Sequence, residues 1–174
     1  ITLSSVAAGL TSLNVYGVIL DTQGASGDGL VCTPDMVPMF KIMPTIAKGA
    51  KTLTSYVDVW NLTEVNRPSS GNVQVEIAKS TDYTIDFAPA DAGNISTGGS
   101  YNNSIWTLDN TDPEKYIFTT SHVFTQNTNK IFKISVIIPE HNTSKTIRVH
   151  AVIPPFSGND GDNTNNTNSE RIEY

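Results

Sequence analysis

Three histidines, His122, His141 and His150, are the side chains best suited to acid–base chemistry near neutral pH. A Ser-His-Asp arrangement can be imagined around any of them, but no Gly-x-Ser-x-Gly elbow singles out one serine. The sequence also has no His-Glu-x-x-His motif and no glycine-rich phosphate loop. We therefore interpret the histidines as surface residues and predict no catalytic site.

Carboxylates could support a different reaction, glycoside hydrolysis, which needs two carboxyl groups on either side of the scissile bond. The candidates are Asp58, Glu64, Glu76 and Asp86. Asp58 and Glu76 fall on the outward positions of predicted strands, where a solvated face accounts for them without chemistry. The sequence therefore favours a protein that is not an enzyme, with a glycan-active enzyme domain as an alternative.

An oxygen-rich segment, Asn159-Asp-Gly-Asp-Asn-Thr-Asn165, is the candidate metal site. Calcium takes about 6–8 oxygen ligands, and this segment offers the carboxylates of Asp160 and Asp162, side-chain amides and backbone carbonyls. Counted from Asp160, it lacks the glycine and glutamate that an EF-hand loop carries at its sixth and twelfth positions. The interpretation that requires no metal ion is a solvated turn. The alternative is a calcium loop at Asp160 and Asp162, and no other cofactor is expected.

Aromatic side chains suggest a glycan contact. Trp60 and Tyr56 share one phase of an alternating segment with Asp58, so both lie on the outward face of the predicted strand. Aromatic rings on an outward face can stack on sugars, and Trp60 and Tyr56 are the residues we select. Trp106 is instead expected to fill the core.

The single cysteine, Cys32, excludes an internal disulfide framework and a cysteine-rich zinc site. Two interpretations stay open for it. The thiol is either buried and idle, or it tethers a partner through an intermolecular disulfide.

The composition indicates where the protein is located. Serine, threonine and asparagine account for 53 of the 174 residues, only 16% are charged, and the formal net charge is −6. The negative charge argues against a nucleic-acid partner. No apolar run approaches the roughly 20 residues that span a bilayer, so no membrane insertion is expected. A polar, uncharged surface is common outside the cell, and we predict an extracellular protein.

Alternation of apolar and polar residues with a period of two dominates the chain, and helix signals are almost absent. Turn residues separate the alternating segments at the spacing of an antiparallel β-sandwich. Pro38 and Pro44 mark the first of these segments as an edge strand. About seven strands are expected within the candidate segments 36–46, 52–61, 73–78, 83–87, 104–108, 116–120, 132–138, 147–153 and 171–174.

The sandwich accounts for residues 36–174 only. Residues 1–35 are predicted to be an N-terminal extension, a linker or the end of a preceding module. Their apolar segment, 15–20, either pairs with the sheet edge of a neighbouring module or subunit, or belongs to the preceding domain or to this sandwich as an extra strand.

Four fragments, taken in order, carry a resemblance to a known kind of module. They are Asp35-Met-Val-Pro-Met-Phe-Lys-Ile, then Val57-Asp-Val-Trp-Asn-Leu-Thr-Glu-Val with the following Gly71-Asn-Val-Gln-Val-Glu-Ile, then Asn102-Asn-Ser-Ile-Trp-Thr-Leu, and finally the Asp/Asn-rich run 159–174. Together they resemble the immunoglobulin-like surface and adhesin modules repeated in large secreted cell-surface proteins of Bacteroidota, of the gliding-motility and cell-adhesion type.

The resemblance implies an antiparallel immunoglobulin-like β-sandwich that is exported by type IX secretion to the bacterial cell surface. The implied role is non-catalytic, structural or adhesive. The partners would be neighbouring modules or subunits of the same surface protein, together with a glycan or another surface ligand. Two alternatives stay open: a carbohydrate-binding accessory domain, and a subunit of an extracellular filament assembled by strand exchange through residues 1–30.

Overall fold

The computed structural model describes residues 33–46, 49–63, 66–140 and 143–174. Cys32, Glu64, His141 and the apolar segment 15–20 lie outside the described residues. The division between an extension at 1–35 and a sandwich at 36–174 therefore stays a prediction.

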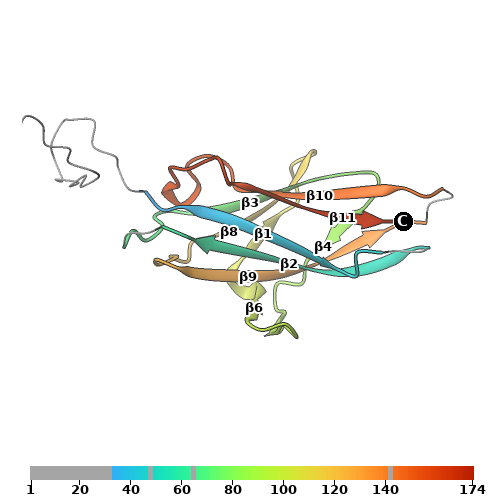
Figure 1. Cartoon of the computed structure of the whole chain (residues 1–174), viewed down its shortest axis with the longest axis horizontal. Helices are drawn as coiled ribbons and strands as arrows, with labels where there is room; N and C mark the ends of the chain where they lie inside the picture. The colour runs from blue at the N-terminus through green and yellow to red at the C-terminus, as the bar shows by residue number, and fades with distance from the viewer. Residues whose placement is uncertain (1–32, 47–48, 64–65, 141–142) are drawn as a thin grey trace, which may run out of the picture. The chain divides into compact units, whose positions relative to one another are not determined.

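The described residues form two antiparallel sheets and a short ribbon (Figure 1). The first sheet has the order β1 (Met36–Met43), β2 (Lys51–Asn61), β9 (Thr128–Ile138) and β4 (Thr84–Asp86). The second has the order β11 (Thr167–Glu173), β10 (Thr146–Val152), β3 (Val73–Ala78), β8 (Lys115–Thr120) and β7 (Thr107–Asp109). The ribbon pairs β5 (Ala92–Asn94) with β6 (Ser100–Asn102), and two 3₁₀ turns are η1 (Asn103–Ile105) and η2 (Ser157–Asn159). Within the part of the chain that the structure describes, no helix is long and apolar enough to cross a membrane.

This strand order is that of an immunoglobulin-like sandwich. Strands β1, β2, β9 and β4 take the places of A, B, E and D in one sheet, and β11, β10 and β3 take those of G, F and C in the other. Strands β8 and β7 extend the second sheet beyond β3. The predicted fold class is confirmed, and the edge position predicted from Pro38 is the one that β1 occupies.

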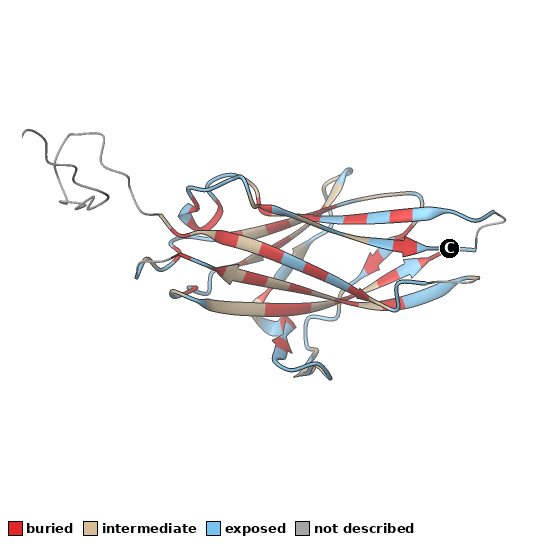
Figure 2. Ribbon diagram, viewed as in Figure 1, coloured by how far each residue is buried: buried red, intermediate tan, exposed pale blue. Residues whose placement is uncertain are grey.

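Alternation in the sequence becomes alternation in burial, visible as red bands along the strands in Figure 2. On β2, Leu53, Val57 and Val59 are fully buried, whereas Tyr56 and Asp58 between them are partly exposed. Because successive side chains of a strand point to opposite faces, one face of each sheet enters the core and the other faces outward.

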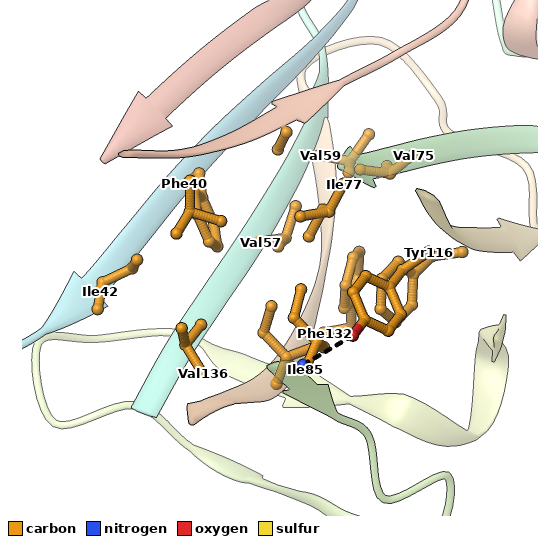
Figure 3. Packing of buried hydrophobic residues seen from close by; sticks show 14 of the residues in the cluster. Phe40, Ile42, Val57, Val59, Val75, Ile77, Ile85, Tyr116, Phe132 and Val136 are labelled. Atoms are coloured by element: carbon orange, nitrogen blue, oxygen red, sulfur yellow. Dashed lines mark hydrogen bonds between the residues drawn. The ribbon is translucent and has the colours of Figure 1, made fainter. Parts of the chain in front are cut away.

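Aliphatic and aromatic side chains together fill the space between the sheets (Figure 3). The rings of Phe118 on β8 and Phe132 on β9 stack with centroids 4.6 Å apart, which joins the two sheets directly. The Tyr116 hydroxyl accepts a hydrogen bond of 3.2 Å from the Ile85 amide, drawn as a dashed line in Figure 3. The core thus links β8 of one sheet to β4 and β9 of the other.

Two segments differ from the sequence predictions. The segment 89–101, which lies between the predicted strands 83–87 and 104–108, contains β5 and most of β6. Gly98 and Gly99 adopt positive φ angles of 107° and 88° there, which glycine adopts without steric cost, so the chain reverses and pairs with itself. Trp106 was predicted on a strand at 104–108, but it lies between η1 and β7. Its core position is confirmed, because only 1% of its surface is exposed.

The first and last strands meet along one side of the sandwich and run parallel, as the blue and red strands of Figure 1 show. Ile46 forms a parallel bridge with Glu173, whose amide donates to the Thr45 carbonyl at 2.9 Å. The Phe40 amide donates to Asn168 Oδ1 at 3.1 Å. Together these contacts close the seam between β1 and β11, and we refer to them below as the terminal-strand seam.

Candidate functional site

A groove on the outer face of the first sheet brings the predicted glycan residue Tyr56 together with side chains that the sequence did not group with it. The groove has a volume of about 230 Å³. Its lining comes from β1, β2, β9 and the β5–β6 ribbon: Met39, Lys41, Met43, Tyr56, Asp58, Ile95, Thr97, Gly98 and Ile131. The floor is set by register, because Lys41 lies opposite Tyr56 and Met39 opposite Asp58. We call this feature the outer groove.

The β5–β6 ribbon forms one wall of the outer groove and is held by a polar network. Lys133 Nζ forms an ion pair of 2.6 Å with Asp91 Oδ2, and the Tyr101 hydroxyl donates to Asp91 Oδ1 at 3.0 Å. The Tyr101 ring lies 5.6 Å from the Tyr56 ring, in a tilted arrangement. The Tyr56 ring therefore packs against a neighbouring ring on one side, which restricts its orientation in the groove.

Asp58 is the charged group of the outer groove whose environment is most perturbed. Burial raises the pKa of its carboxyl above the ordinary value, although a 2.7 Å hydrogen bond from Asn129 Nδ2 and the adjacent Trp60 side chain both act to lower it. Asp58 therefore keeps the outward strand position that the sequence predicted, but it is only partly exposed there. A partly desolvated carboxylate beside an aromatic ring is a suitable acceptor for ligand hydroxyl or ammonium groups.

Replacing Asp58 with asparagine is expected to raise the free energy of unfolding at neutral pH, since the amide oxygen can still accept from Asn129 but carries no charge to desolvate. A folded-state pKa above the unfolded value makes wild-type stability fall as pH rises through the window between them. The gain should therefore appear across that window and disappear in more acidic solution. Urea unfolding at several pH values measures it, and Asp86→Asn controls for the loss of one charge. A gain that is equal at every pH would contradict the assignment.

Trp60, the other predicted glycan residue, does not line the outer groove. Its side chain is only partly exposed, and its indole Nε1 is buried without a well-formed hydrogen bond among the described residues. Trp60 instead lies beside Asp58, where it favours the ionised carboxylate. The structure thus separates two residues that the alternation had placed in one role.

The predicted calcium loop also divides into two unlike parts. Asp162 is exposed, and its Oδ1 accepts hydrogen bonds from the Thr164 amide at 2.9 Å and the Thr164 hydroxyl at 2.6 Å. These bonds lower the pKa of Asp162. Asp160 is buried with 1% of its surface exposed, and burial raises the pKa of its carboxyl. The loop is therefore not a uniformly solvated turn, which was the interpretation that required no metal ion.

The remaining sequence candidates do not converge. Asp58 and Asp86 lie on one sheet, opposite Ile131 and Ser135 of β9, which places them about 13 Å apart along the strand direction alone. Paired glycosidase carboxyl groups are separated by about 5–9.5 Å. Glu76 faces outward from the other sheet and pairs with Lys115 at 2.8 Å.

The histidines show no grouping either. His122 and His150 are both exposed. Among the described residues, no group of three histidine, cysteine, aspartate or glutamate side chains could hold a metal ion.

Met39, Lys41 and Ile131 are among the groove residues that the sequence did not single out. Alternation from Pro38 places Met39 and Lys41 on the outward phase of their strand, so their exposure was within reach of the sequence. Their position beside Tyr56 was not, because it depends on the register between strands and on a ribbon that closes over them.

No protein-family model matches the sequence, and no curated protein is detectably similar to it. Several solved structures are weakly similar. The CARDB domain of a Pyrococcus furiosus protein, in complex with di-metal ions, is 13% identical, with a TM-score of 0.44 over 80% of this chain and 87% of that one. AvmM, which catalyses macrocyclization in alchivemycin A biosynthesis, is 9% identical, with a TM-score of 0.40 over 81% and 89%. A type II cohesin domain from the cellulosome of Acetivibrio cellulolyticus is 10% identical, with a TM-score of 0.32 over 80% and 88%. Likenesses of this size carry no argument about ligand or activity.

Proposed function

We propose that this protein is a non-catalytic structural or adhesive module of an extracellular bacterial surface protein, of the Bacteroidota gliding and adhesion type exported by type IX secretion. The terminal-strand seam carries the proposal. Strand β1 starts at one end of the sandwich and β11 finishes at the other, while the two strands run parallel (Figure 1). A tensile force between the two ends therefore acts along these strands. The partners we propose are neighbouring modules or subunits of the same surface protein.

Geometry decides how such a module resists force. Pulling β1 and β11 in opposite directions shears the β1–β2 and β10–β11 ladders, whose hydrogen bonds lie across the strands and share the force. Pulling the two ends of a hairpin apart instead breaks one bond at a time. A spacer that holds an adhesive surface away from the cell benefits from the first arrangement.

Single-molecule pulling tests this role on the full chain. Attachment at positions 33 and 174 is expected to give a higher unfolding force than attachment at positions 33 and 62. The Leu62 amide donates to the Asp35 carbonyl, so positions 33 and 62 lie at the open end of the β1–β2 hairpin. Pulling at these two positions therefore peels the hairpin apart. Asn168→Ala removes the acceptor of the Phe40 amide and should lower only the first force. Equal forces for the two attachments would contradict a structural role under tension.

Glycan binding is the second candidate function, and the outer groove is the observation that favours it. A fixed tyrosine ring, a partly desolvated carboxylate and the Lys41 ammonium line one concave surface, which combines stacking with hydrogen bonding. We expect Tyr56→Ala to abolish most binding on a glycan array, and Trp60→Ala to weaken it through Asp58. His150→Ala, on the outer face of the other sheet, should leave it unchanged. An array without any bound glycan for the wild type would reject this function.

A further inference from the structure

Buried oxygens without partners gather in the loop between β10 and β11. Six buried side-chain nitrogen or oxygen atoms have no hydrogen-bond partner in the described chain. Three are a serine hydroxyl and two indole nitrogens, and the other three are Asp160 Oδ2, Asn165 Oδ1 and Asn166 Oδ1. Carboxylate and amide oxygens only accept, so they need a donor or a cation. Every such buried oxygen that lacks a partner in the described chain therefore lies in one loop.

Asp160 makes this loop electrostatically unusual. It exposes 1% of its surface, and its Oδ1 accepts a 3.1 Å hydrogen bond from the Asp162 amide. The Asn166 side-chain amide nitrogen and the Met36 amide also face the carboxyl group as donors and lower its pKa against the larger effect of burial, although neither makes a well-formed hydrogen bond to Oδ2. The ion pairs found among the described residues involve other carboxylates, and none involves Asp160. A buried carboxylate without a cation carries a large desolvation cost unless it binds a proton or a metal ion.

A second carboxylate belongs to the same place. Asp35 lies near enough to Asp160 to repel its negative charge, and Asp35 Oδ1 accepts from Asn165 Nδ2 at 2.8 Å. The Gly161 amide donates to the Pro34 carbonyl at 3.3 Å. A side chain at Gly161 would lie 2.0 Å from the Thr33 hydroxyl oxygen, so the segment 33–36 and the loop approach as closely as only glycine permits.

We propose that Asp160, Asp35 and the amide oxygens of Asn165 and Asn166 bind one divalent, oxygen-preferring cation of the calcium class, with backbone carbonyls and water completing its shell. The proposed metal ligands are all hard oxygen atoms, which suit calcium rather than zinc. Two carboxylates give a weak site, with a dissociation constant of about 10⁻⁴–10⁻³ M, the range of extracellular calcium modules. Asp162 is left out, because Thr164 occupies its Oδ1 and its side chain faces solvent.

The bound cation would fasten the start of β1 to the loop that precedes β11. Its ligands come from residue 35 and from 160–166, which are far apart in the sequence and already joined by the Asn165–Asp35 hydrogen bond. Calcium would therefore stabilise the end of the sandwich at which β1 begins. This inference does not depend on the proposed structural or glycan-binding role.

Thermal unfolding of the full chain tests the site. At a calcium concentration ten times the dissociation constant, the unfolding equilibrium constant should fall roughly elevenfold, which corresponds to a Tm rise of about 3–6 °C. A chelator should reverse the rise. Asp160→Asn should remove the calcium response while leaving the metal-free protein at least as stable as wild type at neutral pH, because the buried charge is gone. Asp162→Asn is the matched control and should keep the full response.

A gain-of-function variant separates a ligand site from general salt effects. Asn166→Asp adds a carboxylate, so it should lower metal-free stability and tighten calcium binding measured by calorimetry. Manganese, a paramagnetic oxygen-seeking ion, should broaden the NMR signals of residues 160–166 in wild type but not in Asp160→Asn. An unchanged wild-type Tm with calcium would overturn the proposal. So would an equal response in Asp160→Asn.

Discussion

Replacing Trp106 with alanine is expected to lower the free energy of unfolding by about 3–5 kcal/mol, the usual cost of deleting a buried tryptophan. The side chain is 1% exposed, and its ring lies 4.7 Å from that of Phe132 and 6.4 Å from that of Phe124. The residue comes from the connection between η1 and β7, so its side chain also anchors that connection to the core. Urea unfolding followed by circular dichroism measures the loss.

Trp106→Phe sharpens this prediction. Nε1 of Trp106 is buried without a partner, so phenylalanine keeps an aromatic contact with Phe132 and removes an unpaired donor. We expect a cost of roughly 1–2 kcal/mol, well below that of alanine. Trp60→Ala serves as the control, since Trp60 is only partly buried and should lose less. A Trp106→Ala cost no greater than that of Trp60→Ala would show that the ring does not support the core.

The strands were predictable because their chemistry is local. Leu53, Val57 and Val59 alternate with polar residues, and a period of two leaves no choice about which face enters the core. Pro38 likewise indicated an edge strand, because proline has no backbone N–H to donate to a neighbouring strand on that side. Which strand pairs with which could not be predicted from the sequence. The pairing of β2 with β9, for example, joins residues more than 60 positions apart, and nothing in either segment specifies the other.

In the candidate sites, too, the side-chain chemistry could be predicted from the sequence, whereas the surroundings of each side chain could not. Tyr56 and Asp160 were selected for their side-chain chemistry, which the sequence states directly. Their environments depend on segments that arrive from elsewhere: the β5–β6 ribbon beside Tyr56, and Asp35 beside Asp160. Trp60 was grouped with Tyr56 because alternation shows the face of a strand but not what covers that face.

Burial of asparagine is a feature of this fold that the sequence alone did not reveal. Asparagine is ordinarily an exposed turn residue, yet Asn61, Asn103 and Asn166 expose at most 4% of their surface. Asn61 shows why. Its Nδ2 donates to the carbonyls of Arg67 and Phe124 at 2.8 and 3.1 Å, so the side chain satisfies backbone groups of loops that have no strand partner. A buried asparagine and a loop asparagine look alike in one sequence.

Replacing Asn103 with alanine is therefore expected to destabilise the protein by about 3 kcal/mol, because a buried acceptor or donor left unpaired costs about 1–3 kcal/mol. Its Nδ2 donates to the carbonyls of Ala88 and Lys133, both at 2.9 Å, and its Oδ1 accepts from the Lys133 amide at 2.8 Å. These bonds attach η1 and the start of the ribbon segment to β9. Denaturant unfolding measures the loss. Asn102→Ala replaces an exposed neighbour whose side chain, among the described residues, bonds Ser104 alone, and it should cost about 1 kcal/mol or less.

Asn103→Asp distinguishes loss of hydrogen bonds from loss of volume. The aspartate has the same shape and still accepts from the Lys133 amide, but it turns a carboxylate oxygen toward the two carbonyls that Nδ2 had served. At neutral pH it should destabilise at least as much as alanine, and acidification should recover part of the loss because a protonated carboxyl group can donate once. The ribbon gives an independent readout, since the Tyr101–Tyr56 contact seen by NMR should weaken in the same variants. If Asn103→Asp were as stable as wild type at neutral pH, the two carbonyls would not depend on this side chain, and the ribbon would be held by its other contacts, such as the Asp91–Lys133 ion pair and the Tyr101–Asp91 hydrogen bond.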